Sequence, residues 1–205
     1  SLQFYYNYLA YILMALLITV IGSIMISFKP IEIKRRNGLG SISNNKMNMI
    51  LLLCNFIFGI VLLILFIIIS YILYPDIMIK TNGLLFMLNS FIFLLTVISL
   101  AYLLVVLFKS GNIIGALATV FSLGSSFLTG IFIPQFLLDD VIIKISKILP
   151  SYWYVKANDN ISTLIKYNST ALKPVYTSFL MQIIFTIIFI VLALFISKYK
   201  QREEN

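Results

Sequence analysis

Side chains that could do acid–base, nucleophilic or metal chemistry are almost absent from the long apolar stretches of this chain. Histidine, the commonest general base and metal ligand, does not occur at all. The single cysteine, Cys54, cannot form an internal disulfide and lies in an apolar run, so we expect a packing role. The sequence also lacks a glycine-rich phosphate loop, paired catalytic carboxylates and a cluster of metal ligands. We therefore predict no catalytic residue, no metal site and no cofactor bound by this chain.

The charged residues that do occur lie mostly between the apolar stretches, and their densest group is in residues 29–46. This segment contains Glu32 and the consecutive Lys34, Arg35 and Arg36. Two interpretations are open. The group could serve only to fix the orientation of the neighbouring elements, or it could form a docking surface for a cytoplasmic partner.

The elements that position these residues follow from composition. Hydrophobic residues make up 61% of the 205 positions and charged residues only 11%, too few to cover a soluble core. Five stretches without Asp, Glu, Lys or Arg each exceed the roughly 20 residues that a helix needs to cross a bilayer. The sequence therefore predicts an all-α, polytopic membrane protein and a single transmembrane domain over residues 1–205. The expected spans are 5–27, 49–74, 84–108, 113–134 and 175–197.

The basic residues also predict the direction of the spans. Lys and Arg are retained on the cytoplasmic side, so the 29–46 loop and the C-terminal tail should lie inside the cell. Ser1 and the long 135–174 loop should then lie outside. Because helices of this kind usually begin inside, we expect these five to be the last of six spans. The formal charge of +8 is explained by this topology, and we expect no nucleic-acid partner.

The expected extracytoplasmic loop contains a second amphipathic element. Residues 135–150 place apolar side chains on one helical face and Asp139, Asp140, Lys144 and Lys147 on the other. Such a helix favours the membrane interface. The aromatic residues Tyr152, Trp153 and Tyr154 follow Pro150 and should anchor the chain at headgroup level.

The fourth span differs from the others in its small side chains. They recur every three or four residues and predict one helix face, formed by Gly115, Thr119, Ser122, Ser126 and Gly130. Stripes of this kind allow helices to pack closely. The stripe is either ordinary helix packing or a surface that slides during transport.

The run Gly130-Ile131-Phe132-Ile133-Pro134, the amphipathic helix, and then Leu149-Pro150-Ser151-Tyr152-Trp153 resemble the signature of ABC-2-type transporter permeases. The 29–46 loop is similar to the cytoplasmic loop of the same family. The resemblance in layout covers essentially the whole chain. The loop departs from the family pattern after Arg36, where it continues Asn37-Gly38-Leu39-Gly40 without a second acidic residue.

The resemblance implies a membrane subunit of an exporter that works as a homo- or heterodimer. A separate cytoplasmic ATPase would bind ATP and Mg and hydrolyse the ATP. Loop 29–46 would hold the coupling helix that docks in this ATPase, with Glu32, Lys34, Arg35 and Arg36 as contacts. A re-entrant outer region with Gly130, Pro134, Pro150, Tyr152 and Trp153 would close the external end of the path. The alternative is a non-transporting membrane anchor or sensor subunit of a multi-protein complex.

Overall fold

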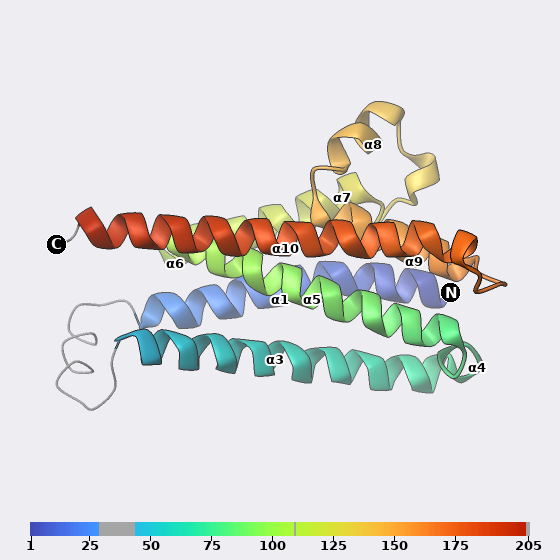
Figure 1. The fold of residues 1–205 in the computed structure, drawn as a ribbon, viewed down its shortest axis with the longest axis horizontal. Helices are drawn as coiled ribbons and strands as arrows, with labels where there is room; N and C mark the ends of the chain where they lie inside the picture. The colour runs from blue at the N-terminus through green and yellow to red at the C-terminus, as the bar shows by residue number, and fades with distance from the viewer. Residues whose placement is uncertain (29–43, 109, 204–205) are drawn as a thin grey trace.

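The structure, a computed structural model, describes residues 1–28, 44–108 and 110–203, and within these residues it contains helices and no strand (Figure 1). Five helical segments are long and apolar enough to cross a membrane. They are α1 (Leu2–Ser27), α3 (Asn44–Leu73), α5 (Thr81–Leu107), the consecutive α6 (Gly111–Thr119), η1 (Val120–Gly124) and α7 (Ser125–Thr129), and α10 (Ser169–Glu203). The expected all-α polytopic class with five spans is confirmed.

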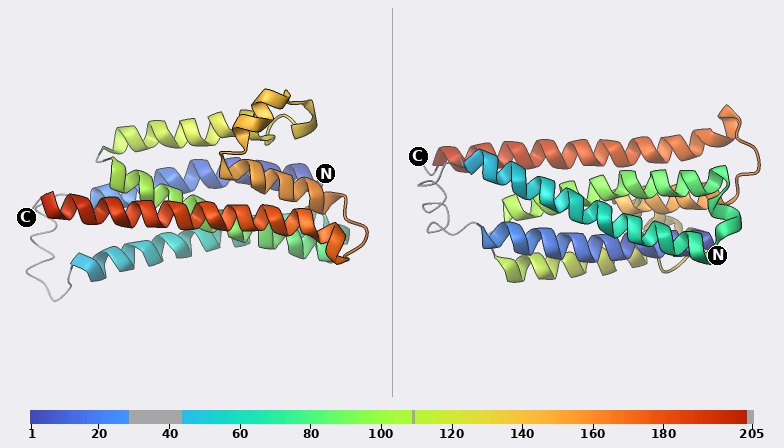
Figure 2. Two further views of the ribbon diagram at one scale, coloured as in Figure 1. Left: turned by 45° about the horizontal axis from the view of Figure 1, so that its top comes forward. Right: turned by 90° about the horizontal axis from the view of Figure 1, so that it is seen from below.

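The spanning helices run up and down, so the first and last described residues lie at opposite ends of the bundle (Figures 1 and 2). The short helix α4 (Pro75–Met78) joins α3 to α5 at one end, which we call the α4 end. The end of α1, the start of α3 and the C-terminal part of α10 lie at the other. There Lys200 Nζ donates to the carbonyl oxygens of Val106 and Leu107 at 2.7 and 3.1 Å. A cation thus caps the last carbonyls of α5.

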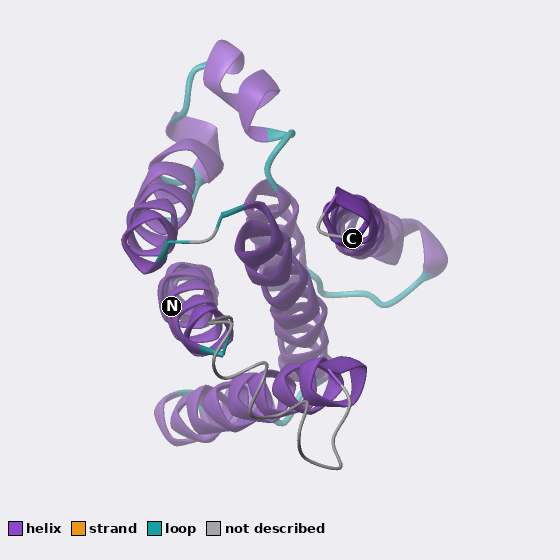
Figure 3. Ribbon diagram, turned by 90° about the vertical axis from the view of Figure 1, so that its left-hand side faces the viewer, coloured by secondary structure: helices purple, strands orange, loops and turns teal. Residues whose placement is uncertain are grey.

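The core of the bundle is built on α1 and α5. Large apolar residues of α1 recur every three or four positions and are completely buried, as expected for one packed helix face. The buried residues of this α1 face include Tyr6, Leu9, Leu13, Leu17 and Ile21. In the end-on view a central helix separates the segment that carries the N-terminus from the one that carries the C-terminus (Figure 3). The helices α3 and α10 expose most of their apolar side chains, as lipid-facing helices do.

The fourth span is interrupted. Its middle turn, η1, is a π-helix, an irregularity that is common at functional sites in helices. The segment ends at Thr129, before the expected end at position 134, because Gly130 adopts a left-handed conformation with φ 100°. Gly130 is therefore the helix terminator, a place where glycine has no steric penalty.

The segment after Gly130 differs from the expected single amphipathic helix over 135–150. It contains a 3₁₀ turn, η2 (Gln135–Leu137), and the short helix α8 (Asp140–Ser146). Asp139 is the N-cap of α8, and its carboxylate accepts a hydrogen bond from the Val141 N–H at 2.9 Å. Figure 2 shows α8 standing to the side of the bundle.

A further helix, α9 (Pro150–Ser162), returns into the bundle. Its presence was not expected, because these residues are too polar to resemble a span. The following helix α10 begins at Ser169, before Pro174 and before the expected start of the span at position 175. The carboxamide oxygen of Asn168 accepts a hydrogen bond from the Ala171 N–H at 2.9 Å and caps this first turn.

Candidate functional site

A chain of buried carboxamides connects four helices in the half of the bundle nearest the α4 end. Asn89 of α5 donates to Asn158 Oδ1 of α9 at 2.8 Å, and Asn158 donates to Asn7 Oδ1 of α1 at 2.9 Å. Gln182 of α10 donates to Asn89 Oδ1 at 2.8 Å. None of the four is more than 2% exposed. We call Asn7, Asn89, Asn158 and Gln182 the amide network.

Tyr154 adds a second set of contacts between α9 and the same helices. Its hydroxyl donates to the carbonyl oxygen of Tyr6 at 2.8 Å and lies 3.0 Å from Ser90 Oγ. Its ring packs on Phe93 with the ring centroids 4.5 Å apart. The Tyr154 hydroxyl thus contacts both α1 and α5 and helps to hold α9 in the bundle.

The contacts of α9 also fix its direction. Along α9, Tyr154 packs beside Phe93 and Asn158 bonds Asn89, while the Ile161 carbonyl accepts from Asn82 at the start of α5. The helix therefore runs antiparallel to α5, toward the α4 end. Its first residue, Pro150, is buried. Such a half-length helix is tolerated at membrane depth because protein, rather than lipid, surrounds it.

The turn that leads from α7 to this region is fixed by Gln135. Its amide nitrogen donates to the carbonyl oxygens of Thr129, at 2.8 Å, and Tyr152, at 3.2 Å. A Cβ on Gly130 would lie 2.4 Å from Gln135 Cγ and 3.2 Å from Val155 Cγ1. Gly130 and Tyr152, two of the expected re-entrant residues, thus both lie next to the side chain of Gln135.

The three expected aromatic anchors differ in their exposure. Tyr152 is 4% exposed and Tyr154 is completely buried, so both rings face neighbouring helices rather than the surroundings of the bundle. The reason is that Pro150 begins a helix that packs against α1, α5 and α10. Trp153 alone is half-buried, and its indole N–H donates to the Lys147 carbonyl at 3.0 Å. The ammonium of Lys156 lies 5.4 Å from the centre of its ring.

Pro134 precedes η2 and is half-buried. Together with Pro150, it bounds the excursion that carries η2 and α8 away from the bundle. Pro134 and Pro150, two more of the expected re-entrant residues, thus lie at the two ends of the segment that contains η2 and α8.

The small-residue stripe of the fourth span divides into two groups. Ser122, Ser126 and Gly130 are buried, whereas Thr119 is exposed and a Cβ on Gly115 would meet no atom within 4 Å. Within this chain the five residues therefore do not form one continuous packed face. The face observed in α6 contains Ile114 and Ala118 instead. The π-turn η1 changes the helical phase between these two groups.

The expected docking residues Glu32, Lys34, Arg35 and Arg36 lie outside the described residues. The sequence analysis did not identify Asn7, Asn158, Gln182 and Gln135. Three of these, Asn7, Gln182 and Gln135, stand in stretches without charged residues, where a carboxamide is itself a signal. Asn158 gave no such signal because its neighbours are polar.

The four members of the amide network are neutral, although the carboxylate of Asp159 accepts a hydrogen bond from one of them, Asn7. Neutral amides can hold helices together and exchange hydrogen-bond partners, but they supply neither acid nor base at neutral pH. Asp159 is the nearest carboxylate in sequence. It accepts a hydrogen bond from Gln3, and burial raises its pKa while bonds from Gln3 and Asn7 lower it.

The comparison with protein families matches residues 1–195 to the ABC-2 family transporter protein. No curated protein and no solved structure matches the chain. The family match covers nearly the whole sequence and agrees with five apolar spanning helices. The chain therefore belongs to the ABC-2 family of transporter proteins and is a multi-pass membrane permease of an ABC transporter.

Proposed function

We propose that this permease is the membrane subunit of an exporter driven by ATP that a separate cytoplasmic subunit hydrolyses. Loop 29–46 transmits the hydrolysis to the membrane helices through Glu32, Lys34, Arg35 and Arg36. Two permease subunits, identical or related, form the path. Ser1 and α9 face the outside of the cell, and the C-terminus faces the cytoplasm.

One observation carries this proposal. Five stretches of the sequence are long enough to cross a membrane and contain no Asp, Glu, Lys or Arg. Carriers driven by protons or ions place ionisable residues at membrane depth despite their cost. The permease therefore needs a source of energy outside its spans. Membership of the ABC-2 family supports an ABC ATPase as that source.

In this proposal α9 is the outer gate. Its amide bonds to α1 and α5 are neutral, so breaking them requires no charge to be moved in a medium of low dielectric constant. Asp159 of α9 adds a bond from Gln3 of α1. The gate opens when α9 moves relative to α5 and the amides find other partners. Because each bond within a membrane is worth only about 1 kcal/mol, a modest conformational driving force suffices.

The test is reconstitution of the intact permease with its ABC ATPase in inverted vesicles. We expect the two subunits to co-purify in mild detergent and the cargo to accumulate in the vesicles only with ATP. Co-purification without ATP-dependent accumulation would support the anchor or sensor role instead. No association with an ATPase under these conditions would refute the proposal.

A further inference from the structure

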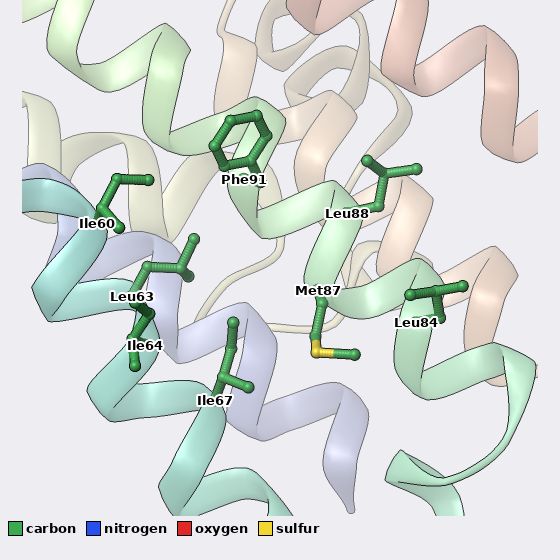
Figure 4. Close-up of a pocket in the computed structure, with 8 residues that line it drawn as sticks. All are labelled: Ile60, Leu63, Ile64, Ile67, Leu84, Met87, Leu88 and Phe91. Carbon is green, nitrogen blue, oxygen red and sulfur yellow. The ribbon is translucent and has the colours of Figure 1, made fainter. Parts of the chain in front are cut away.

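An apolar groove with a volume of about 310 Å³ lies between α3 and α5 (Figure 4). The side chains that line it are aliphatic, aromatic or thioether groups, and none can form a strong hydrogen bond. Leu63 of α3 is 3% exposed, whereas Ile64, Leu88 and Phe91 are 49%, 43% and 37% exposed. The groove is therefore open along one side, toward the surroundings of the bundle.

Its position in the helices gives its depth. On α5 the groove extends from Leu84 to Phe91, and on α3 from Ile60 to Ile67. Seven residues of helix correspond to about 10 Å along the axis. Leu84 is one turn from Lys80, the residue that precedes α5 at the α4 end. The groove thus lies at the depth of the acyl-chain segments that are nearest to the headgroups at the α4 end.

The size of the groove discriminates between occupants. A helix is about 10 Å across, much wider than a single hydrocarbon chain, so a helix from a second copy or from another part of a longer chain would lie over the groove rather than along its floor. A single hydrocarbon chain is thin enough to enter, and the apolar lining offers no polar partner to water.

One cation at the α4 end, Lys80, can pair with an anionic headgroup. Lys80 is exposed, and none of the described residues forms a salt bridge with it. It stands at the N-terminus of α5, where the helix dipole also favours negative charge. Asp76, on α4, is the nearest acidic residue along the chain. A phosphate at this level would lie about one helical turn beyond Leu84.

We propose that the α3–α5 groove retains one acyl chain of an anionic phospholipid, whose phosphate lies beside Lys80. This lipid is resident, unlike the lipids that exchange freely around the bundle. It fills the wedge between α3 and α5 and stabilises their crossing. The proposal does not depend on which cargo the permease moves or on its energy source.

The experiment uses the intact permease in vesicles of phosphatidylcholine that contain phosphatidylglycerol with a photoactivatable acyl chain. After illumination, the labelled residues are mapped by mass spectrometry. We expect labelling to be several-fold higher on the α3 and α5 residues of the groove than on the exposed face of α10. Leu88→Trp, which fills the groove from its rim, should remove this excess. Ile187→Trp, on the exposed face of α10, is the matched control and should leave the excess unchanged.

The headgroup is tested separately with Lys80→Gln. This variant should label equally well from phosphatidylglycerol and phosphatidylcholine carrying the same photoactivatable chain, whereas the unmodified permease should prefer phosphatidylglycerol. Even labelling of α3, α5 and α10 would show exchangeable lipid only and overturn the proposal. Crosslinks from the groove to another protein segment, in place of lipid, would overturn it too. If Leu88→Trp lowers the unfolding temperature, Leu84→Trp provides a second test at the more exposed rim.

Discussion

The carboxamide of Gln182 on α10 donates to Asn89 on α5, and this bond joins a peripheral helix to the centre of the bundle. The helix α10 exposes most of its apolar side chains, so shape complementarity alone fixes its rotation weakly. Thr96 and Thr186, whose hydroxyls lie 2.8 Å apart, form a second link between the same two helices. Polar contacts at these two levels thus specify how α10 faces the bundle.

Replacing Asn89 by leucine should destabilise the permease by about 1 to 3 kcal/mol, because buried polar groups on its partners lose their bonds. Asn158→Leu should have a similar effect, and the double variant should cost less than the sum because the two residues share one bond. Thermal unfolding in detergent measures all three. Thr119→Val is the control at an exposed hydroxyl, where little change is expected. Strictly additive effects of Asn89→Leu and Asn158→Leu would contradict the network.

Gly130→Ala should destabilise the permease by about 1 to 2 kcal/mol from its left-handed backbone alone. The new methyl group would also displace Gln135 from its bonds to Thr129 and Tyr152. Unfolding temperature and protease sensitivity of residues 131–149 report the two effects. Gly115→Ala is the matched control, because it lies in a helix with open space at the Cβ position. An equal response of the two variants would exclude the proposed role of the turn.

Ser126→Leu should cost about 1 to 3 kcal/mol, since Ser126 is completely buried and a larger side chain would overpack its site. Thr119→Leu, two turns earlier on the expected stripe, should be almost neutral because Thr119 is exposed. The comparison is made by thermal unfolding of both variants in the same detergent. It tests the division of the small-residue stripe directly. Similar losses at the two positions would restore a continuous packing face.

The five spans were predictable from the sequence because uncharged apolar stretches longer than a bilayer have few alternatives. Helix α9 was not predictable in this way. Its sequence alternates tyrosines, amides and charged residues, and its burial depends on partners such as Asn7 and Asn89 that lie far away in the chain. A polar helix becomes acceptable at membrane depth only when other helices complete its hydrogen bonds.

The phase of the fourth span shows a second limit of sequence patterns. A regular helix would place Gly115, Thr119 and Ser126 on nearly one face, but the π-turn at Val120–Gly124 rotates the later residues relative to the earlier ones. Spacing alone does not reveal such a turn. Where Gly22 of α1 approaches α6, its neighbour is the side chain of Ile114 rather than a small residue.

Asp159→Asn should raise the stability of the permease at neutral pH. Burial raises the pKa of this carboxyl above its ordinary value of 3.8, so the ionised form weakens the folded state. As the pH falls through the raised pKa the folded protein binds a proton first and gains stability, and this gain is complete below about pH 3.8. The advantage of the variant should therefore shrink on acidification, as followed by unfolding temperature against pH. Asp140→Asn, at an exposed position, is the control. A constant advantage across this pH range would refute the assignment.

Reversing the charges of Arg35 and Arg36 tests whether loop 29–46 docks on the ATPase. Arg35→Glu with Arg36→Glu should lower cargo-stimulated ATP hydrolysis and weaken co-purification, because like charges would then face the acidic partners that the arginines require. Lys198→Glu with Arg202→Glu reverses two charges of the tail, which the same topology places on the same side of the membrane, and serves as the matched control. Membrane insertion, measured by extraction with detergent but not with alkali, should be retained in both.

The two outcomes separate the interpretations of the basic loop. If the cluster only determines topology, Arg35→Glu with Arg36→Glu should disturb the orientation of the spans and leave hydrolysis normal in correctly inserted molecules. If it is the docking surface, orientation should be retained while hydrolysis and association fall together. Raising the salt concentration should weaken association of the unmodified pair as well, since exposed charge pairs are screened over about 8 to 10 Å. Association that is indifferent to both salt and charge reversal would place the contact with the ATPase elsewhere.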